Sequence, residues 1–175
     1  MQPLPCDRLL KEKARDFPIP EVISMARIED VAAYVLDQRG PITAMKLQKL
    51  CYYAQAWNLV WEDQPLFDAR IEAWANGPVI TDLYRMHRGC FNLDAGDITG
   101  DADALTPEER ETVDAVLDFY GGMTAHQLSD LTHREDPWQQ ARESAGLSPM
   151  DRGTAEITTA AMHEFYLTLA TAETE

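Results

Sequence analysis

Residues 46–57 read KLQKLCYYAQAW and form the centre of a segment with helical hydrophobic spacing. Thr43 is placed to cap this helix, because a threonine hydroxyl can accept a hydrogen bond from a backbone amide of the first turn. Apolar side chains recur on one face of the segment: Leu47, Leu50, Cys51, Ala54, Trp57 and Trp61. Since an apolar stripe this wide must be buried against other elements, the segment is predicted to be a core helix.

The opposite face of this helix is mainly polar. It carries Lys46, Gln48, Lys49, Tyr52, Gln55 and Asn58. All of these except Asn58 are candidate partner-binding residues, since tyrosine in particular supplies amphipathic contact area with little conformational entropy to lose. The alternative is a core helix with a solvated back. Tyr53 and Trp57 are expected in the core, because large aromatic residues at helical spacing usually pack inward.

Two further elements are predicted close to this helix. Apolar residues recur at helical spacing from Ile28 to Arg39, and Gly40–Pro41 supplies a stop, so this segment is expected to be the first helix. Between Ile71 and Asn76 apolar and polar residues alternate, which favours a short extended segment near residues 69–75.

Gly77–Pro78 is expected to open another helix, which runs through His87 and ends at Gly89. Proline is tolerated in a first turn because its missing N–H has no partner there. Trp74, Gly77 and Pro78 could shape a surface groove, although helix-entry geometry also explains the Gly–Pro pair. We therefore keep Trp74, Pro78 and Tyr84 as candidate partner-binding residues.

The C-terminal half carries two capping-box patterns. Thr106 and Glu109, with Pro107 at the first helical position, predict a helix that runs to Tyr120. Thr124 and Gln127 predict the start of the next helix. Residues 92–105, which precede the first of these helices, are rich in Asp and Gly and are expected to form a loop.

Two more helices are expected toward the C-terminus. Asp136 resembles an N-cap, followed by a first-turn proline. A final amphipathic helix is expected over about residues 154–169. Its predicted inward residues are Ile157, Ala161, Phe165 and Leu169.

The predicted fold is a mainly α, compact single-domain bundle of about six to seven helices. Residues 1–24, which contain four prolines, are expected to be an N-terminal extension or a mis-assigned start. Residues 25–171 then form the domain and residues 172–175 a tail.

Charge and cysteine usage restrict the partners. The formal net charge of −15 would repel a nucleic-acid backbone, so no direct nucleic-acid binding is expected. An acidic surface steers basic proteins toward it or serves solubility alone. The eight carboxylates between Asp97 and Asp118 could mimic nucleic acid toward a basic toxin or form a solvated face. The three cysteines, Cys6, Cys51 and Cys90, suggest no disulfide framework, and no signal peptide or membrane span is apparent, so a cytoplasmic location is expected.

His133 and Trp138 are the remaining candidate partner-binding residues. His133 lies beside Glu135 and Asp136, which could form an acid–base pair with it, but closure of a helix C-terminus explains this histidine more simply. Trp138 could anchor a partner or lock its own helix to the core. His87 and Cys90 have a spacing that could hold a metal ion, but no further ligands lie nearby, so no metal site is expected. We also expect no catalytic residue and no cofactor, since the sequence contains no convincing catalytic constellation.

Three stretches together resemble a known family. They are KLQKLCYYAQAW (46–57), IEAWANGPV (71–79) and LSDLTHREDPW (128–138), and the resemblance extends from about residue 25 to residue 169. In this order they are similar to the Panacea domain, also called SocA-like or GepA-like, of toxin–antitoxin systems. The resemblance implies an antitoxin that binds a cognate protein toxin, usually encoded adjacently, without catalysis.

Other functions stay open beside this one. One member of the family acts as an adaptor that delivers its toxin to an ATP-dependent protease, so a proteolysis adaptor for a toxin or a regulator is the first alternative. An enzyme that uses His133 with Glu135 or Asp136 is the second.

Overall fold

The computed structural model describes residues 25–173, and within this range lie seven α-helices, four short β-strands and a 3-10 helix. In chain order the elements are α1 (Ile28–Arg39), β1 (Ile42–Thr43), α2 (Ala44–Trp61), β2 (Ile71–Trp74), β3 (Gly77–Ile80), α3 (Thr81–His87), β4 (Asn92–Leu93), η2 (Ala102–Ala104), α4 (Pro107–Tyr120), α5 (Ala125–His133), α6 (Asp136–Ser144) and α7 (Thr159–Ala172). The mainly α prediction is confirmed. The predicted extension, residues 1–24, with Cys6, lies outside the described residues.

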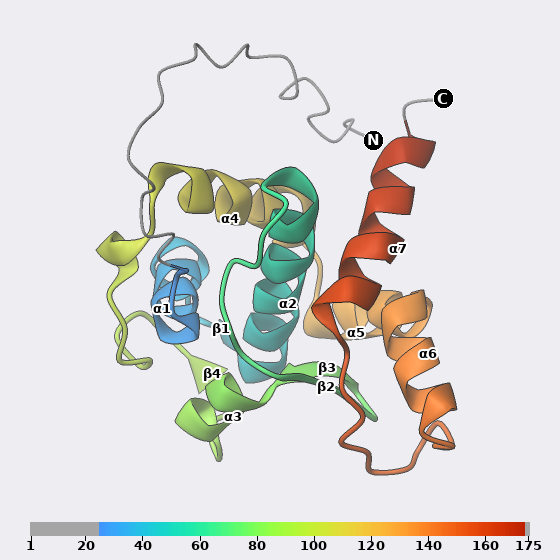
Figure 1. Cartoon of the computed structure of the whole chain (residues 1–175). Coiled ribbons are helices and arrows are strands. Elements are labelled where there is room, and N and C mark those ends of the chain that lie inside the picture. Colours follow the sequence, from blue (N-terminus) through green and yellow to red (C-terminus); the bar gives the residue numbers. More distant parts are fainter. Residues whose placement is uncertain (1–24, 174–175) are drawn as a thin grey trace.

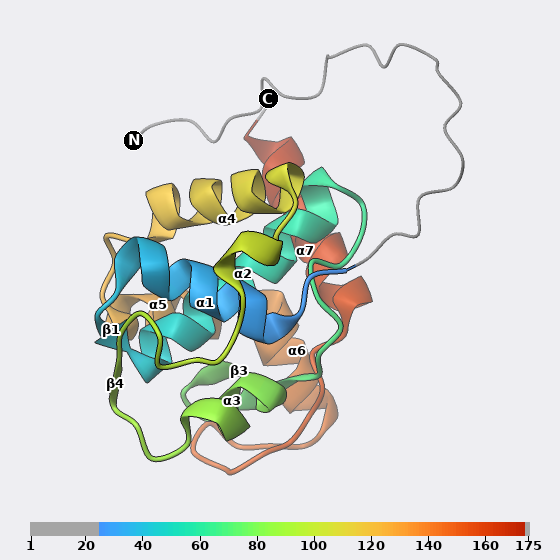
Figure 2. The ribbon, with the colours of Figure 1, turned by 90° about the vertical axis from the view of Figure 1, so that its left-hand side faces the viewer.

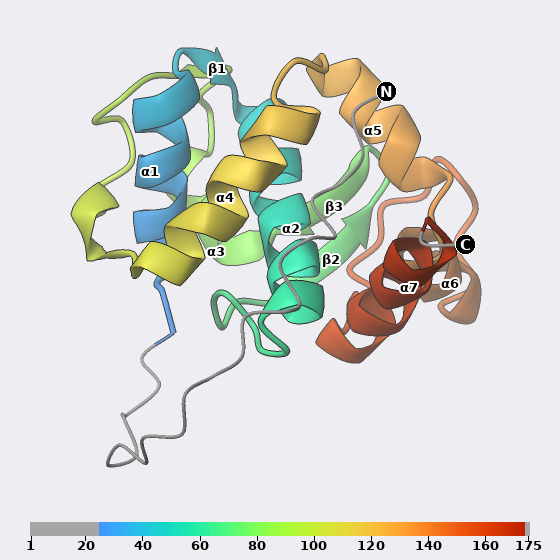
Figure 3. The ribbon, with the colours of Figure 1, turned by 90° about the horizontal axis from the view of Figure 1, so that it is seen from above.

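Helix α2 lies at the centre of the fold (Figures 1 and 3). It packs against α1, α4, α5 and α7, and β3 contacts it as well. Every residue from Leu47 to Leu59 is buried. The predicted core positions of Tyr53 and Trp57 are confirmed. The predicted solvated back is wrong, because neighbouring elements cover both faces of this helix.

The predicted helix starts at threonine residues are confirmed. Thr43 caps α2 by accepting a hydrogen bond of 3.1 Å from the backbone amide of Lys46. Complete capping boxes begin α4 at Thr106 and α5 at Thr124. Each box satisfies two amides that would otherwise lack partners at a helix end. These local signals therefore fix where three of the helices begin.

The helix predicted to follow the extended segment directly begins later than expected. Residues 71–80 form an antiparallel hairpin, in which β2 pairs with β3 through Ile71↔Ile80 and Ala73↔Pro78. The prediction that Gly77–Pro78 opens a helix is wrong, since both residues belong to β3 and α3 starts at Thr81. Gly77 has φ +111°, a backbone conformation that suits the hairpin turn and that other residues rarely adopt.

A third extended segment continues this hairpin. Glu156 forms an antiparallel bridge with Glu72, and the amide of Ile157 donates a 2.9 Å hydrogen bond to the carbonyl of Ile71. The amide of Ala73 donates in the same way to the carbonyl of Ala155 at 2.8 Å. The chain just before α7 is therefore attached to the outer edge of β2.

The region between α3 and α4 is mostly loop, as predicted, with two small ordered pieces. Strand β4 pairs with β1 through Ile42↔Leu93. The loop then crosses α1 (Figure 2), where the amide of Asp101 donates a 2.8 Å hydrogen bond to the carboxylate of Asp30. Ile98 and Leu105 are buried, so this acidic loop is anchored by two apolar side chains.

Two details of the last helices differ from the predictions. The N-cap of α6 is Glu135, and Asp136 is its first helical residue. Helix α7 begins at Thr159 and buries Met162 and Tyr166. Ile157 is buried as predicted, but Ala161 and Phe165 are only partly buried and Leu169 is 39% exposed. The inward face is therefore rotated by one residue from the predicted one.

No helix within residues 25–173 is long and apolar enough to span a membrane.

Candidate functional site

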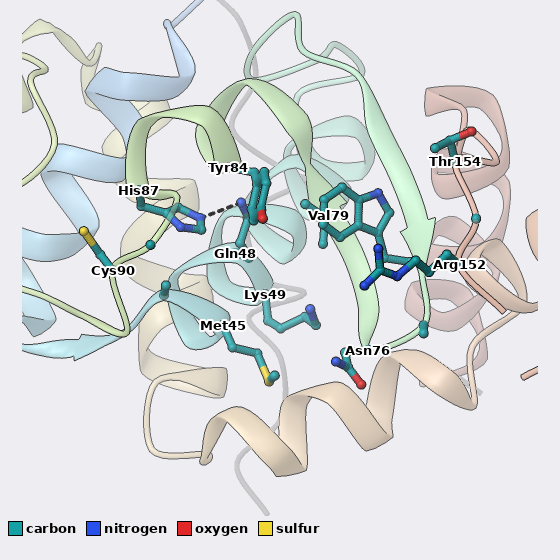
Figure 4. Close-up of a pocket in the computed structure, with 15 residues that line it drawn as sticks. Met45, Gln48, Lys49, Asn76, Val79, Tyr84, His87, Cys90, Arg152 and Thr154 are labelled. Carbon is teal, nitrogen blue, oxygen red and sulfur yellow. Dashed lines mark hydrogen bonds between the residues drawn. The ribbon is translucent and has the colours of Figure 1, made fainter. Parts of the chain in front are cut away.

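A pocket of about 700 Å³ opens between the start of α2, the β2–β3 hairpin, α3 and residues 152–154 (Figure 4). Its size lies within the range of small-ligand pockets, which is roughly 300–1,000 Å³. Gln48 and Lys49 line it from α2, and Trp74 and Val79 line it from the hairpin. The pocket is therefore built by segments that are distant in the sequence.

One wall is ordered by the side chain of Gln48. The side-chain amide of Gln48 makes the two backbone hydrogen bonds that a neighbouring strand would make to Ile80. Its Oε1 accepts from the amide of Ile80 at 2.8 Å, and its Nε2 donates to the carbonyl of Ile80 at 3.2 Å. The same Nε2 lies 2.9 Å from Nε2 of His87 and donates to it (Figure 4). Burial lowers the pKa of His87, which favours the neutral imidazole that this contact requires.

Lys49 is the buried cation of the pocket. Its side chain is 1% exposed, and its Nζ donates a 3.1 Å hydrogen bond to the carbonyl of Pro78. Burial lowers the pKa of this amine to about 7, since water no longer solvates the charged form. Lys49 can therefore be charged or neutral near physiological pH.

An aromatic pair forms the next part of the wall. The rings of Trp74 and Tyr84 meet edge to face with centroids 4.8 Å apart, a favoured arrangement for aromatic rings. The indole of Trp74 donates a 2.7 Å hydrogen bond to the carboxylate of Glu72. Both aromatic residues are half-buried, so each presents ring surface to the pocket.

Arg142 positions the last wall. Its buried guanidinium donates to the carbonyl of Ala73 at 2.8 Å and to the carbonyls of Ser148 and Asp151 at 2.6 and 2.9 Å. It also lies over the ring of Trp138, 5.1 Å from the centroid. These contacts join α6, β2 and the loop that leads to Arg152, which lines the pocket.

A second hollow of about 450 Å³ adjoins the first. The two share Ala44, Met45, Asn76 and Cys90 in their linings. The exposed ring of Phe91 and the imidazole of His133 line the second hollow only. The two hollows therefore form one continuous face around the beginning of α2.

His133 ends α5, as the simpler interpretation predicted. Its ring packs against Trp138 with centroids 4.3 Å apart, and its buried Nε2 has no hydrogen-bond partner within residues 25–173. Burial and the nearby amine of Lys49 both lower the pKa of His133. The carboxylate of Glu135 contacts Tyr53 and Tyr166 instead, so the geometry gives no support to an acid–base pair of His133 with Glu135.

The structure divides the ten candidate partner-binding residues into two groups. Half-buried and accessible are Lys46, Trp74, Tyr84, His133 and Trp138. Buried are Gln48, Lys49, Tyr52, Gln55 and Pro78. The expected exposure of the buried group is wrong, and the reason is visible at Gln55, whose amide hydrogen-bonds both N and O of Phe67 at 3.2 and 2.9 Å. Such side chains satisfy the backbone of segments that wrap around α2.

The pocket brings four of the candidates together, which are Gln48, Lys49, Trp74 and Tyr84. Lys46 lies apart from it and donates a 2.7 Å hydrogen bond to the carbonyl of Gly121. Sequence reasoning missed Arg142 and Arg152. No local pattern marks Arg152, whereas Arg142 could have been suspected because it is the one arginine of α6 beside a tryptophan four positions earlier.

Comparison with known proteins identifies the family. Residues 47–139, just over half of the chain, match the family model described as antitoxin SocA-like, Panacea domain. The chain belongs to this family. Antitoxin SocA of Caulobacter vibrioides (strain NA1000 / CB15N) is 30% identical over 136 residues, which cover 66% of this chain and 70% of the relative. No solved structure matches this Panacea domain significantly.

The matched range contains most of the Panacea-domain site. Lys49, Trp74, His133 and Trp138 lie within residues 47–139, and Arg152 lies beyond them. The pocket is therefore completed by a segment outside the part that the family model describes.

Proposed function

We propose that this Panacea domain is an antitoxin that neutralises a protein toxin by binding it directly. The match to the SocA-like family carries the proposal. The relative named antitoxin SocA supports it over two thirds of the chain. The proposed action is stoichiometric rather than catalytic, as the family match suggests, and the carboxylate of Glu135, one of the two suggested acid–base partners of His133, contacts Tyr53 and Tyr166 instead.

The continuous face around the two hollows is the proposed toxin-binding surface. Phe91 is 78% exposed and Met45 is 38% exposed, and large apolar side chains at a surface hollow are typical of protein interfaces. Trp74 and Tyr84 add half-buried aromatic area next to them. The net charge of −15 would steer a basic toxin toward the molecule from a distance.

The proposed location is the cytoplasm, and a protease is the alternative partner. An adaptor would bind the toxin through the same surface and then present it to an ATP-dependent protease. The two functions differ in the fate of the toxin, which persists in a complex in one case and disappears in the other.

The test is growth of cells that express the neighbouring gene product from an inducible promoter, with and without this chain, followed by co-purification. Rescue together with a stable complex is the expected result. Rescue without a complex, but with a shortened toxin half-life in a pulse–chase experiment, would favour the adaptor. Rescue by neither route would contradict an antitoxin function toward that gene product.

The surface is tested by Phe91→Asp with Leu167→Asp as the matched control. Both side chains are exposed, at 78% and 41%, and Leu167 lies on α7, outside both hollows. Phe91→Asp is expected to weaken toxin binding at least tenfold, while Leu167→Asp leaves it within about twofold. Equal effects of the two substitutions would contradict the proposed surface.

A further inference from the structure

The main pocket differs in charge from the molecule that contains it. The chain has a net charge of −15, yet none of the residues that line the pocket is an Asp or Glu. Two of them, Lys49 and Arg152, are basic. A cationic hollow on an otherwise acidic protein is complementary to an anionic group of a ligand.

Lys49 supplies the first cation. An ammonium group has three N–H donors, and one hydrogen bond is made, to the carbonyl of Pro78. Within residues 25–173 no carboxylate forms an ion pair with Lys49. A buried charge without a counter-ion is costly, and a ligand carboxylate at Nζ would remove that cost. Burial lowers the pKa of Lys49 to about 7, and no neighbouring carboxylate offsets this effect of desolvation.

Arg152 supplies the second cation, at the mouth. It is exposed and makes no hydrogen bond or ion pair among the described residues, while Arg142 fixes the loop just before it through the carbonyls of Ser148 and Asp151. Figure 4 shows the side chains of Lys49 and Arg152 directed into the same hollow. A guanidinium binds a carboxylate through two parallel N–H donors.

The start of α2 adds to this potential. Ala44 and Met45, in its first turn, line the pocket, and this turn contains no acidic residue. The N-terminal end of a helix carries a partial positive charge, so it favours an anion nearby. The three sources of positive potential come from α2 and from residue 152, more than 100 positions apart in the chain.

We propose that this pocket receives one acidic side chain, Asp or Glu, of the bound toxin, between Lys49 at the base and Arg152 at the mouth. The proposal rests on the proposed antitoxin function. A single carboxylate would supply the counter-ion that the buried Lys49 lacks, and Arg152 at the mouth would donate further hydrogen bonds to it. The walls of Trp74, Val79 and Tyr84 suit the hydrocarbon stem of an amino acid, and the exposed Met45 at the rim continues into the apolar binding surface.

The experiment measures toxin affinity by calorimetry for the full chain and three variants. Arg152→Glu is expected to weaken binding at least tenfold, because a carboxylate then faces a carboxylate, and Lys49→Met about tenfold. Arg85→Glu is the charge-matched control, since Arg85 is exposed and lines a different hollow, and it should stay within twofold. Thermal unfolding of each variant is the control that checks whether the fold is retained.

A charge swap decides the result. Each Asp and Glu of the toxin is changed in turn to Lys, and one of these variants is expected to recover at least tenfold of the affinity lost by Arg152→Glu. If the wild-type chain binds the toxin and neither Arg152→Glu nor Lys49→Met weakens this binding, the inference is overturned while the proposed function stands. Competition by ATP without a successful charge swap would assign the pocket to a phosphate ligand and also overturn it. Failure of the wild-type chain to bind would overturn the proposed function itself.

Discussion

Tyr53 donates a hydrogen bond of 2.5 Å from its hydroxyl group to Oε1 of Glu135, which lies 82 residues later in the chain. Tyr166 donates to the other oxygen of the same carboxylate. Tyr53 belongs to α2 and Tyr166 to α7, while Glu135 is the N-cap of α6. One buried carboxyl group therefore links three helices, and each of its two oxygens has a hydrogen-bond donor, as buried polar groups require.

Tyr166→Phe is expected to destabilise the protein by about 1–3 kcal/mol, because one oxygen of the buried Glu135 loses its donor. Chemical denaturation at pH 7 measures the change in free energy of unfolding. Tyr34→Phe is the control, since the hydroxyl of Tyr34 donates a 2.7 Å hydrogen bond to Asp114 at the surface, and its effect should stay below about 0.5 kcal/mol. Similar losses for both variants would contradict a special role of the buried pair.

The pH dependence of stability provides a second prediction. Burial raises the pKa of Glu135 from 4.5 to about 7, against the opposing effect of the two tyrosine hydrogen bonds. Between pH 4.5 and 7 the folded state therefore holds a proton that the unfolded state has released, so this residue makes the protein less stable as pH rises through that window. The loss is at most about 3.5 kcal/mol at about 1.4 kcal/mol per pKa unit.

Glu135→Gln isolates this effect, because glutamine resembles the protonated carboxyl group and does not titrate. Relative to the wild type, the variant is expected to gain stability from pH 4.5 to 7. Denaturation midpoints measured across this range test the expectation. A constant difference between the two proteins would show that Glu135 keeps an ordinary pKa in the fold.

The contribution of Lys49 to stability changes with pH in the opposite direction. Its pKa is lowered from 10.5 to about 7 by burial, so from pH 7 to 10.5 the unfolded state binds more protons and stability rises with pH. The rise is at most about 5 kcal/mol. Lys49→Met should remove it, since methionine keeps the apolar stem without a titrating group. Unfolding measured from pH 7 to 9.5 tests this, and parallel curves for variant and wild type would contradict it.

Gly77→Ala is expected to destabilise the fold by about 2–4 kcal/mol, through both backbone strain and crowding. A Cβ at this position would lie 2.6 Å from Cε of Lys49 and 2.9 Å from Oγ1 of Thr132. Gly89→Ala is the control, because Gly89 has φ +86° but open space around it, and backbone strain alone should cost about 1 kcal/mol. Equal costs measured by thermal unfolding would mean that the hairpin tolerates the side chain.

The rotated face of α7 is tested by two truncations. Met162→Ala removes a fully buried side chain and is expected to cost about 2–5 kcal/mol, whereas Leu169→Ala, at a position 39% exposed, should cost less than about 1 kcal/mol. The reverse order would support the inward face that the sequence predicted.

Local signals predicted much of the fold and less of the site. The capping threonines Thr43, Thr106 and Thr124 were identified because each pattern involves residues only three positions apart. The hairpin was missed at Gly77–Pro78, where a proline after a glycine is equally compatible with a helix entry and an edge strand. Whether Gly77–Pro78 forms a helix entry or a strand depends on its pairing with β2 and on its contacts with Lys49. Neither of these can be read from the sequence around Gly77.

The sequence by itself determined the helical class, the starts of three helices, the core positions on the apolar face of α2 and the family. These properties follow from short-range periodicity, from caps and from three motifs that can be read in order. Only the tertiary structure decided that the polar face of α2 is buried, because Gln48 and Gln55 bond to the backbone of segments that return to the helix later in the chain. It also decided that Lys49 and Arg152 share one pocket, since chain folding, rather than spacing, brings them together.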